Sequence, residues 1–206
     1  MGEPKSKNAP FGLTETAKTF LKDEARKNLF QFDDGFSGNR YTVKGNECEW
    51  AGVRQSGLMR GRVFEKNTIT MQNAWLRGTC DVWDKATRTI VDIKCSFSIG
   101  THPFFDDDAE KKVKEMGYDW QMHAYMFLYD ADSADVDFWL FPTPDHLIPA
   151  YADPVMYQEC VENIPLRHRF ATVRIGRDDE KIQRIKEKVE QAHAYYNHIT
   201  QRYLND

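Results

Sequence analysis

Residues 78–97 read GTCDVWDKATRTIVDIKCSF, and this stretch decides the fold. The flanking segments 75–83 and 88–97 are rich in Val, Ile, Thr and Trp, which favour β-strands. A short polar turn, DKAT at 84–87, separates the two segments. The pattern predicts a β-hairpin near the middle of the chain.

The second strand of this hairpin alternates between two kinds of side chain, which places them on opposite faces. One face carries Val91, Ile93, Cys95 and Phe97, and is expected to pack into a core. The other face carries Asp92, Lys94, Ser96 and Ser98. We expect this polar face to lie on an exposed edge of the hairpin. Asp81, on the preceding strand, can reach the same face across the hairpin.

Asp81 and Asp92 therefore converge, and two close carboxylates are unfavourable unless a cation neutralises them. Ligands that are all oxygen suit a hard ion such as Mg²⁺ or Mn²⁺. The ammonium group of Lys94 beside that ion can orient an attacking water or help to deprotonate it. The alternative is an ordinary solvent-facing cluster of Asp and Lys side chains.

Two helices predicted on either side of the hairpin carry further candidates. Glu49 lies in GNECEWA at the start of a predicted helix over 45–58, and can give the cation a third oxygen. Alternatively, it is a favourable charge in the first turn of that helix. Gln121 and Tyr125 are four residues apart on a later helix and share a face. Gln121 can hydrogen-bond to Lys94 or to metal-bound water, or simply occupy a polar rim.

The remaining pattern predicts helices and strands in mixed order. We expect helices over 13–32, 108–130 (broken at Gly117), 153–163 and 178–204, and strands over 61–65, 67–74 and 135–141. Helices around a mixed sheet indicate an α/β or α+β fold with a central sheet flanked by helices. The apolar seam of 178–204 fits a terminal helix lying on the core, or a self-associating coil.

Length and composition set the remaining limits. The chain has 206 residues, which suits one domain over 13–206 after a mobile N-terminal segment, 1–12. Its net charge of −4 argues against a non-specific coat on nucleic acid. No apolar run approaches the roughly 18 residues of a membrane span, and we expect no membrane partner. The N-terminus lacks the apolar core of a signal peptide, which favours the cytoplasm.

Some residues that attract attention have simpler interpretations. Alternation turns Cys80 and Cys95 away from the carboxylates, so we expect core thiols. The four cysteines have no zinc spacing. His123 is expected at the surface. The run Asp106–Asp108 is expected to cap a helix.

The order Glu49, Asp81, Asp92-Ile93-Lys94 and Gln121–Tyr125 resembles the PD-(D/E)xK nuclease superfamily. The likeness is strongest to the branch of lambda-type phage exonucleases, YqaJ-like recombinases and RecB nuclease domains. It rests on the segments GNECE, LRGTCD, VDIKCSFS and WQMHAY within residues 45–141, and RDDEKIQRI near the end also fits. The resemblance implies a PD-(D/E)xK nuclease-like core with its sheet and flanking helices.

The same resemblance implies a catalytic site with Mg²⁺ or Mn²⁺ as cofactor. Asp81, Asp92 and the carbonyl of Ile93 would hold the metal, and Glu49 would complete the site. Lys94 would position the attacking water, supported by Gln121, while Tyr125 would pack against the site. Asp92 stands where many relatives have Glu. Asp is the shorter ligand, and the family pattern allows it. Relatives with an iron–sulfur cluster have several cysteines near the C-terminus, whereas only Cys160 lies late here, so no cluster is expected.

The resulting hypothesis is a magnesium-dependent deoxyribonuclease, a phage-type exonuclease that attacks duplex DNA at its ends in recombination or repair. The alternatives are a structure-specific endonuclease with the same site, and a non-catalytic nucleic-acid-binding protein on a nuclease-like fold. A homo-oligomer and a single-strand annealing partner are further expectations, with the host cytoplasm as location if the protein is phage-encoded. Candidate DNA contacts are Arg54, Arg60, Arg62, Arg77, Ser96, Arg167, Arg169, Arg174 and Arg177.

Overall fold

The computed structural model describes residues 10–32, 35 and 38–204. The chain forms two compact units, one of residues 38–177 and one that combines 1–37 with 178–206. Of the predicted mobile segment 1–12, residues 1–9 lie outside the described residues, and Pro10–Gly12 form a short 3-10 helix, η1. A single folded domain over 13–206 stays a prediction.

A four-stranded mixed sheet forms the centre of the larger unit, in the order β3-β4-β5-β6. The strands are β3 (Val82–Asp84), β4 (Thr89–Ser96), β5 (Ser133–Leu140) and β6 (Phe170–Gly176). β3 and β4 form the predicted antiparallel hairpin, β4 and β5 run parallel, and β5 pairs with β6 antiparallel. The predicted mixed sheet is confirmed, and β4 is an inner strand of it.

The sequence pattern overestimated the strands before β3. Among the described residues before β3, only Met71–Gln72 (β1) and Arg77–Gly78 (β2) are strands, and they pair with each other in a separate ribbon. The strand predicted at 61–65 is wrong. That segment follows the end of a helix, with the Arg62 N–H bonded to the Gly57 carbonyl, and the buried Phe64 side chain anchors it. Side-chain packing, not a strand ladder, holds it in place.

Helix α2 (Arg40–Met59) covers one face of the sheet, where Val53 packs with Val91, Ile93 and Trp139. It begins well before the predicted position 45, because Asn39 caps it and accepts hydrogen bonds from the N–H groups of residues 41 and 42. GNECE therefore lies inside the helix. Glu49 is not in the first turn.

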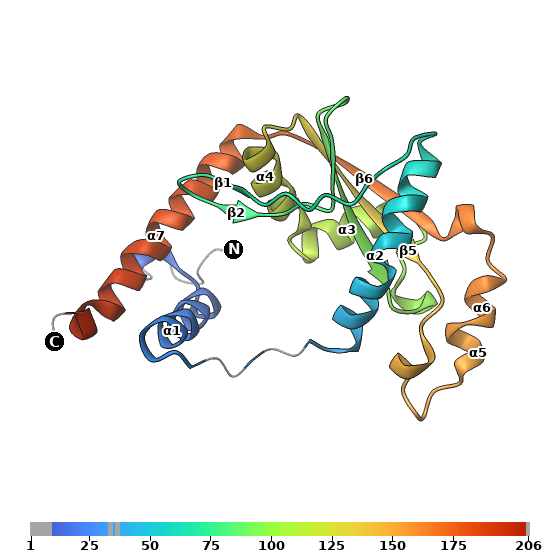
Figure 1. The fold of residues 1–206 in the computed structure, drawn as a ribbon, viewed down its shortest axis with the longest axis horizontal. Helices are drawn as coiled ribbons and strands as arrows, with labels where there is room; N and C mark the ends of the chain where they lie inside the picture. The colour runs from blue at the N-terminus through green and yellow to red at the C-terminus, as the bar shows by residue number, and fades with distance from the viewer. Residues whose placement is uncertain (1–9, 33–34, 36–37, 205–206) are drawn as a thin grey trace. The chain divides into compact units, whose positions relative to one another are not determined.

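Two other helices, α3 (Asp106–Glu115) and α4 (Tyr118–Tyr129), cover the opposite face (Figure 1). The predicted break at Gly117 is confirmed, since this residue has φ 70°, where a side chain would be strained. Asp106–Asp108 occupy the first turn of α3, where negative charge favours the helix dipole. The N-cap itself is Phe105, whose side chain forms no capping hydrogen bond.

A fully buried lysine joins α2 to the sheet. Lys44 has no exposed surface, and its Nζ donates to the carbonyls of Phe97 and Phe141 and to the hydroxyl of Thr143. These acceptors follow the ends of β4 and β5. Burial lowers the pKa of Lys44 to about 8. The contacts fix the start of α2 against the ends of the two inner strands.

Short elements connect the remaining strands. They are η2 (Ile99–Thr101), η3 (Asp145–Leu147), α5 (Pro154–Tyr157), α6 (Glu159–Glu162) and η4 (Leu166–His168). The helix predicted at 153–163 is split into α5 and α6 because Gln158 departs from helical geometry, with φ −122° and ψ −80°. β6 was not predicted from the sequence.

The smaller unit contains α1 (Glu15–Phe30) and α7 (Asp179–Leu204), which pack together. Their bounds confirm the helices predicted at 13–32 and 178–204. Asn28 donates to the Tyr196 hydroxyl at 3.0 Å, and Lys188 donates to the Gly12 carbonyl at 2.9 Å. None of the described helices has the length and apolar character that crossing a membrane requires.

The close approach of α2 to β4 gives a stability prediction. A Cβ atom on Gly52 would lie 2.4 Å from Cγ2 of Ile93, so Gly52→Ala should destabilise the fold by about 1–3 kcal/mol. Gly45, in the same helix, has no neighbouring atom within 4 Å of such a Cβ. Gly45→Ala should therefore stabilise by about 0.5–1 kcal/mol through helix propensity. Urea unfolding of both variants measures the difference; equal effects would contradict the packing argument.

Candidate active site

Asp81 and Asp92 meet across the start of the β3–β4 hairpin. Asp81 directly precedes β3, and its Oδ2 accepts a hydrogen bond from the Ile93 N–H at 2.7 Å. Asp92 lies in the middle of β4 and is only 2% exposed. The expectation of an exposed edge is therefore wrong, because β4 is an inner strand and α4 packs over this face.

Burial raises the pKa of both carboxyl groups. For Asp81, desolvation is the main cause and the nearby charge of Asp92 adds to it, so that the pKa rises to about 7. For Asp92, desolvation again dominates and outweighs the attraction of Lys94. The Oδ2 atom of Asp92 is also buried without an aligned hydrogen bond. Such a pair is poorly satisfied by the protein alone.

Lys94 faces the same carboxylates from the next position on that face of β4. Its Nζ lies 2.7 Å from Asp92 Oδ2 as an ion pair, although the angle does not make an aligned hydrogen bond. Burial alone would lower the pKa of Lys94, but the charge of Asp92 outweighs burial and raises it. Lys94 therefore stays an ammonium group, suited to donating hydrogen bonds and stabilising negative charge.

Helix α4 supplies the groups that surround the lysine. Lys94 Nζ donates to Gln121 Oε1 at 3.3 Å, and Gln121 Nε2 donates to the Tyr125 hydroxyl at 3.5 Å. The predicted contact between Gln121 and Lys94 is present. Tyr125 is half-buried and packs against the core cluster under α4, in keeping with a bracing position.

Tyr118 is a neighbour of Lys94 that the sequence reasoning missed. Nζ of Lys94 lies 4.6 Å from the centre of the Tyr118 ring, within range of a cation–π interaction. Tyr118, Gln121 and Tyr125 are spaced by three and four residues, so they share one face of α4. That spacing was the available signal.

Glu49 lies close enough to add to the negative charge around Asp81 and Asp92. Its Oε2, however, accepts from Lys66 Nζ in an ion pair that the sequence did not suggest. Ile93 places its N–H on Asp81 and its side chain against α2. Among the described residues, no three Asp, Glu, His or Cys side chains are grouped to hold a metal ion.

The donor set nevertheless suits a hard divalent cation. Asp81 and Asp92 offer carboxylate oxygens, and one of those oxygens is buried without an aligned donor. A bound cation would offset the burial and the repulsion from Asp92 that together raise the pKa of Asp81. To become the third ligand, Glu49 would have to give up its ion pair with Lys66 and bind the cation instead.

Several predicted DNA contacts are arginines that the structure engages in ion pairs. Arg60 binds the buried carboxylates of Asp135 and Asp137, and Arg174 binds Asp135 as well. Arg62 pairs with Asp84, and Arg177 lies 3.7 Å from Asp130. These pairs hold strands and helix ends together. A contact with DNA stays a prediction for these four residues.

The other candidates divide by exposure. Arg54, Arg77 and Arg167 are exposed, and Arg169 is half-buried. Ser96 is 5% exposed and its hydroxyl lies 3.1 Å from Nδ1 of His102, which argues against contact with DNA.

The structure also shows how far Cys80 and His123, which we did not expect in the site, are buried. Cys80 is fully buried as expected, and burial raises the pKa of its thiol to about 12. His123 was expected at the surface, which is wrong. It is 1% exposed, with Nδ1 2.6 Å from the Asp119 carbonyl, because its turn of α4 faces the core.

Comparison with solved structures identifies the family. A phage-related exonuclease from Haemophilus somnus 129PT is 45% identical and superposes with a TM-score of 0.91. The match covers 98% of this chain and 91% of that one. The chain belongs to the phage-related exonucleases. It is a nuclease of the lambda-exonuclease and YqaJ branch of the PD-(D/E)xK superfamily, as the sequence predicted.

A more distant exonuclease supports the same fold. The alkaline exonuclease LHK-Exo of Laribacter hongkongensis is 13% identical, with a TM-score of 0.61 over 93% of this chain and 87% of that one. LHK-Exo in complex with dAMP gives a TM-score of 0.58 at 14% identity, over 91% and 85% of the two chains. No protein-family model and no curated protein matches this exonuclease.

The raised pKa of Asp81 predicts how the metal-free exonuclease responds to pH. Because the folded-state pKa lies near 7 instead of 3.8, the folded chain binds more protons between these values. The Asp81 contribution to the free energy of unfolding therefore falls as pH rises from about 4 to about 7. Asp81→Asn keeps an acceptor for the Ile93 N–H and should gain about 1–3 kcal/mol relative to wild type over this range.

Denaturant unfolding in excess chelator at several pH values measures this difference. Asp107→Asn, which removes an exposed carboxylate from α3, controls for the loss of one negative charge. A difference between wild type and Asp81→Asn that stays constant with pH, or shrinks as pH rises, would contradict the assignment.

Proposed function

We propose that this nuclease is a magnesium- or manganese-dependent deoxyribonuclease that degrades duplex DNA from its ends. The observation that carries the proposal is the set of the buried Asp92 with the half-buried Asp81 and Lys94, extended by Gln121. The set lies in a chain 45% identical to a phage-related exonuclease. Two carboxylates beside one ammonium group suit phosphodiester hydrolysis, which passes through a state of increased negative charge.

Asp81 and Asp92 would hold the cation, with the Ile93 carbonyl and Glu49 as further oxygen ligands. When bound, a divalent cation polarises the phosphoryl oxygen and lowers the pKa of a coordinated water. The carboxylates themselves would fix where the cation is held, since Asp81 is oriented by the Ile93 N–H and Asp92 by its burial in β4.

Lys94 would orient the attacking water and stabilise the charge that develops on the phosphate. Its ammonium group is directed by three neighbours, the carboxylate of Asp92, the amide oxygen of Gln121 and the ring of Tyr118. Because the charge of Asp92 raises the pKa of Lys94, the lysine is better suited to donating hydrogen bonds than to accepting a proton.

Attack at DNA ends is supported by the charge of the chain. The net charge of −4 gives no broad attraction to duplex DNA, so selectivity would come from a confined site with local contacts to phosphates. The exposed Arg54 and Arg77 are available for such contacts. The proposal includes a role in recombination or repair in the host cytoplasm, self-association and a single-strand annealing partner.

Replacing the lysine tests the catalytic assignment. Lys94→Ala should lower the rate of duplex cleavage by at least about 100-fold, because the loss of one preorganised donor at developing charge is of this size. Lys111→Ala, an exposed lysine on α3, is the matched control and should cleave at the wild-type rate. The wild type should need Mg²⁺ and stop in excess chelator. Folded Lys94→Ala with wild-type turnover would remove the lysine from the mechanism.

Comparing topologies of one plasmid tests end dependence. With Mg²⁺ at low salt, the linearised plasmid should shorten steadily while the covalently closed circle persists, because only the linear form offers an end. Gel electrophoresis over time distinguishes the two. Prompt nicking of the circle would indicate an endonuclease, and binding without loss of either form would indicate a non-catalytic DNA-binding protein.

A further inference from the structure

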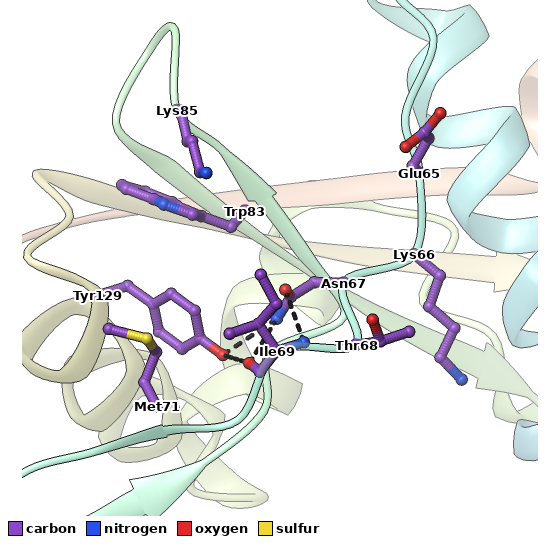
Figure 2. A pocket seen from close by; sticks show the side chains of 9 residues that line it. All are labelled: Glu65, Lys66, Asn67, Thr68, Ile69, Met71, Trp83, Lys85 and Tyr129. Atoms are coloured by element: carbon purple, nitrogen blue, oxygen red, sulfur yellow. Dashed lines mark hydrogen bonds between the residues drawn. The ribbon is translucent and has the colours of Figure 1, made fainter.

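A cavity of about 420 Å³ lies beside the catalytic carboxylates in the larger unit. Segment 65–71, the side chains of Trp83 and Lys85, and Tyr129 at the end of α4 form its walls (Figure 2). Its volume is within the range of roughly 300–1,000 Å³ of pockets that hold small organic groups. None of the catalytic candidates lines it.

The cavity is nevertheless tied to the active site through two consecutive residues of its wall. Lys66 pairs with Glu49, and the Asn67 N–H donates to the Asp81 carbonyl at 2.7 Å. A polymer held at Asp81 therefore has this cavity as a direct neighbour. That position suits a subsite for another part of the same substrate.

One wall of the cavity is preformed by hydrogen bonds. Asn67 Nδ2 donates to the Cys80 carbonyl and to the Tyr129 hydroxyl, both at 3.0 Å. Asn67 Oδ1 accepts from the Ile69 N–H at 3.1 Å, and the Tyr129 hydroxyl donates to the Ile69 carbonyl at 2.6 Å. Figure 2 shows the bonds among Asn67, Ile69 and Tyr129 at the corner formed by residues 67–69. A ligand would meet a wall that needs little ordering.

The inner surface offers an aromatic ring with apolar neighbours. Trp83 is half-exposed and its ring lies 6.0 Å from that of Tyr129, while Ile69 is 60% exposed and Met71 is 38% exposed. One part of Trp83 packs against the core cluster under α4, and the rest of its surface is exposed to the cavity. A flat, conjugated group would cover this surface well.

The rim adds positive charge. Lys85 is exposed on the hairpin turn, and no acidic side chain among the described residues forms an ion pair with it. Lys66 lies on the opposite side of the cavity and is shared with Glu49, while Glu65 contributes one negative charge. An aromatic surface with a free lysine at its edge is the combination that binds a base and its phosphate in single-stranded nucleic acid.

We propose that this cavity binds one unpaired base of single-stranded DNA, stacked on Trp83, with Lys85 near the adjoining phosphate. The proposal rests on the deoxyribonuclease function proposed above and names an additional subsite for its substrate. A strand end that leaves the duplex at the catalytic carboxylates would place a neighbouring base here. Stacking is tolerant of sequence, because every base has a π-face.

The test measures binding without cleavage. A fluorescently labelled single-stranded oligodeoxynucleotide and an abasic oligonucleotide of the same length and charge are titrated in excess chelator, and anisotropy gives each Kd. Trp83→Ala should weaken binding of the base-bearing strand about 10-fold and leave the abasic strand within about twofold of wild type. Trp83→Phe keeps an aromatic ring and should restore most of the affinity.

Lys85→Ala serves as the companion variant, because an exposed turn residue can be replaced without disturbing the core. It should weaken both strands to a similar extent, since its contact is to phosphate. Circular dichroism and the unfolding midpoint of each variant show whether the fold is retained. If Trp83→Ala is misfolded, Trp83→Leu replaces it, because leucine keeps apolar bulk against the core cluster and removes the aromatic ring. It should weaken binding of the base-bearing strand alone.

Three results would overturn the proposal. They are an equal loss on both strands in Trp83→Ala, no loss on either strand, and failure of the wild type to prefer the base-bearing strand. Because no result depends on turnover, the proposal can fail while the plasmid assay still shows cleavage. Conversely, base-dependent binding by a wild type that cleaves neither plasmid form would retain the cavity and reject the nuclease function.

Discussion

The site depends on burying two carboxylates beside a single ammonium group. Asp81 and Asp92 lie where water cannot solvate them fully, and Lys94 is the cation that approaches Asp92 at 2.7 Å. Burial raises the pKa of both carboxyl groups, and the single positive charge of Lys94 does not offset it. This residual imbalance makes the site suitable for an additional cation, and it sets stability against function at these positions.

The central sheet, α2 and α4 each help to hold the two carboxylates and Lys94 in position. The parallel pairing of β4 with β5 puts Asp92 in the middle of a sheet, and the absence of a side chain at Gly52 lets α2 approach β4 closely enough to bring Glu49 near. Lys44 holds the other end of α2 to the ends of both strands. On the opposite face, α4 directs Gln121 and Tyr118 at the lysine. Each layer therefore contributes one constraint on the same few atoms.

The sequence predicted the site better than its surroundings, for identifiable reasons. Alternation along one strand is a local property, so Asp92 and Lys94 could be assigned to one face, and the spacing on a helix brought Gln121 to them. Exposure is not local: whether that face meets water depends on β5 and α4, which arrive from distant parts of the chain. The partners of Glu49 and Arg60, and the strand β6, likewise depend on long-range pairing. The start of α2 was missed because the Asn39 cap outweighed the local pattern.

The parallel pairing of β4 and β5 also has a consequence for biosynthesis. The β3–β4 hairpin is complete once residue 96 has been made, but its partner strand β5 ends at Leu140, after the whole of α3 and α4. Until then, β4 has an unpaired edge that carries the apolar side chains of an inner strand, which is the type of surface that promotes aggregation. A nascent or truncated chain that ends between residues 96 and 140 thus exposes the unpaired edge of β4 and its apolar side chains. A chain whose synthesis stalls in this interval would therefore need a chaperone more than a chain that stalls near either end.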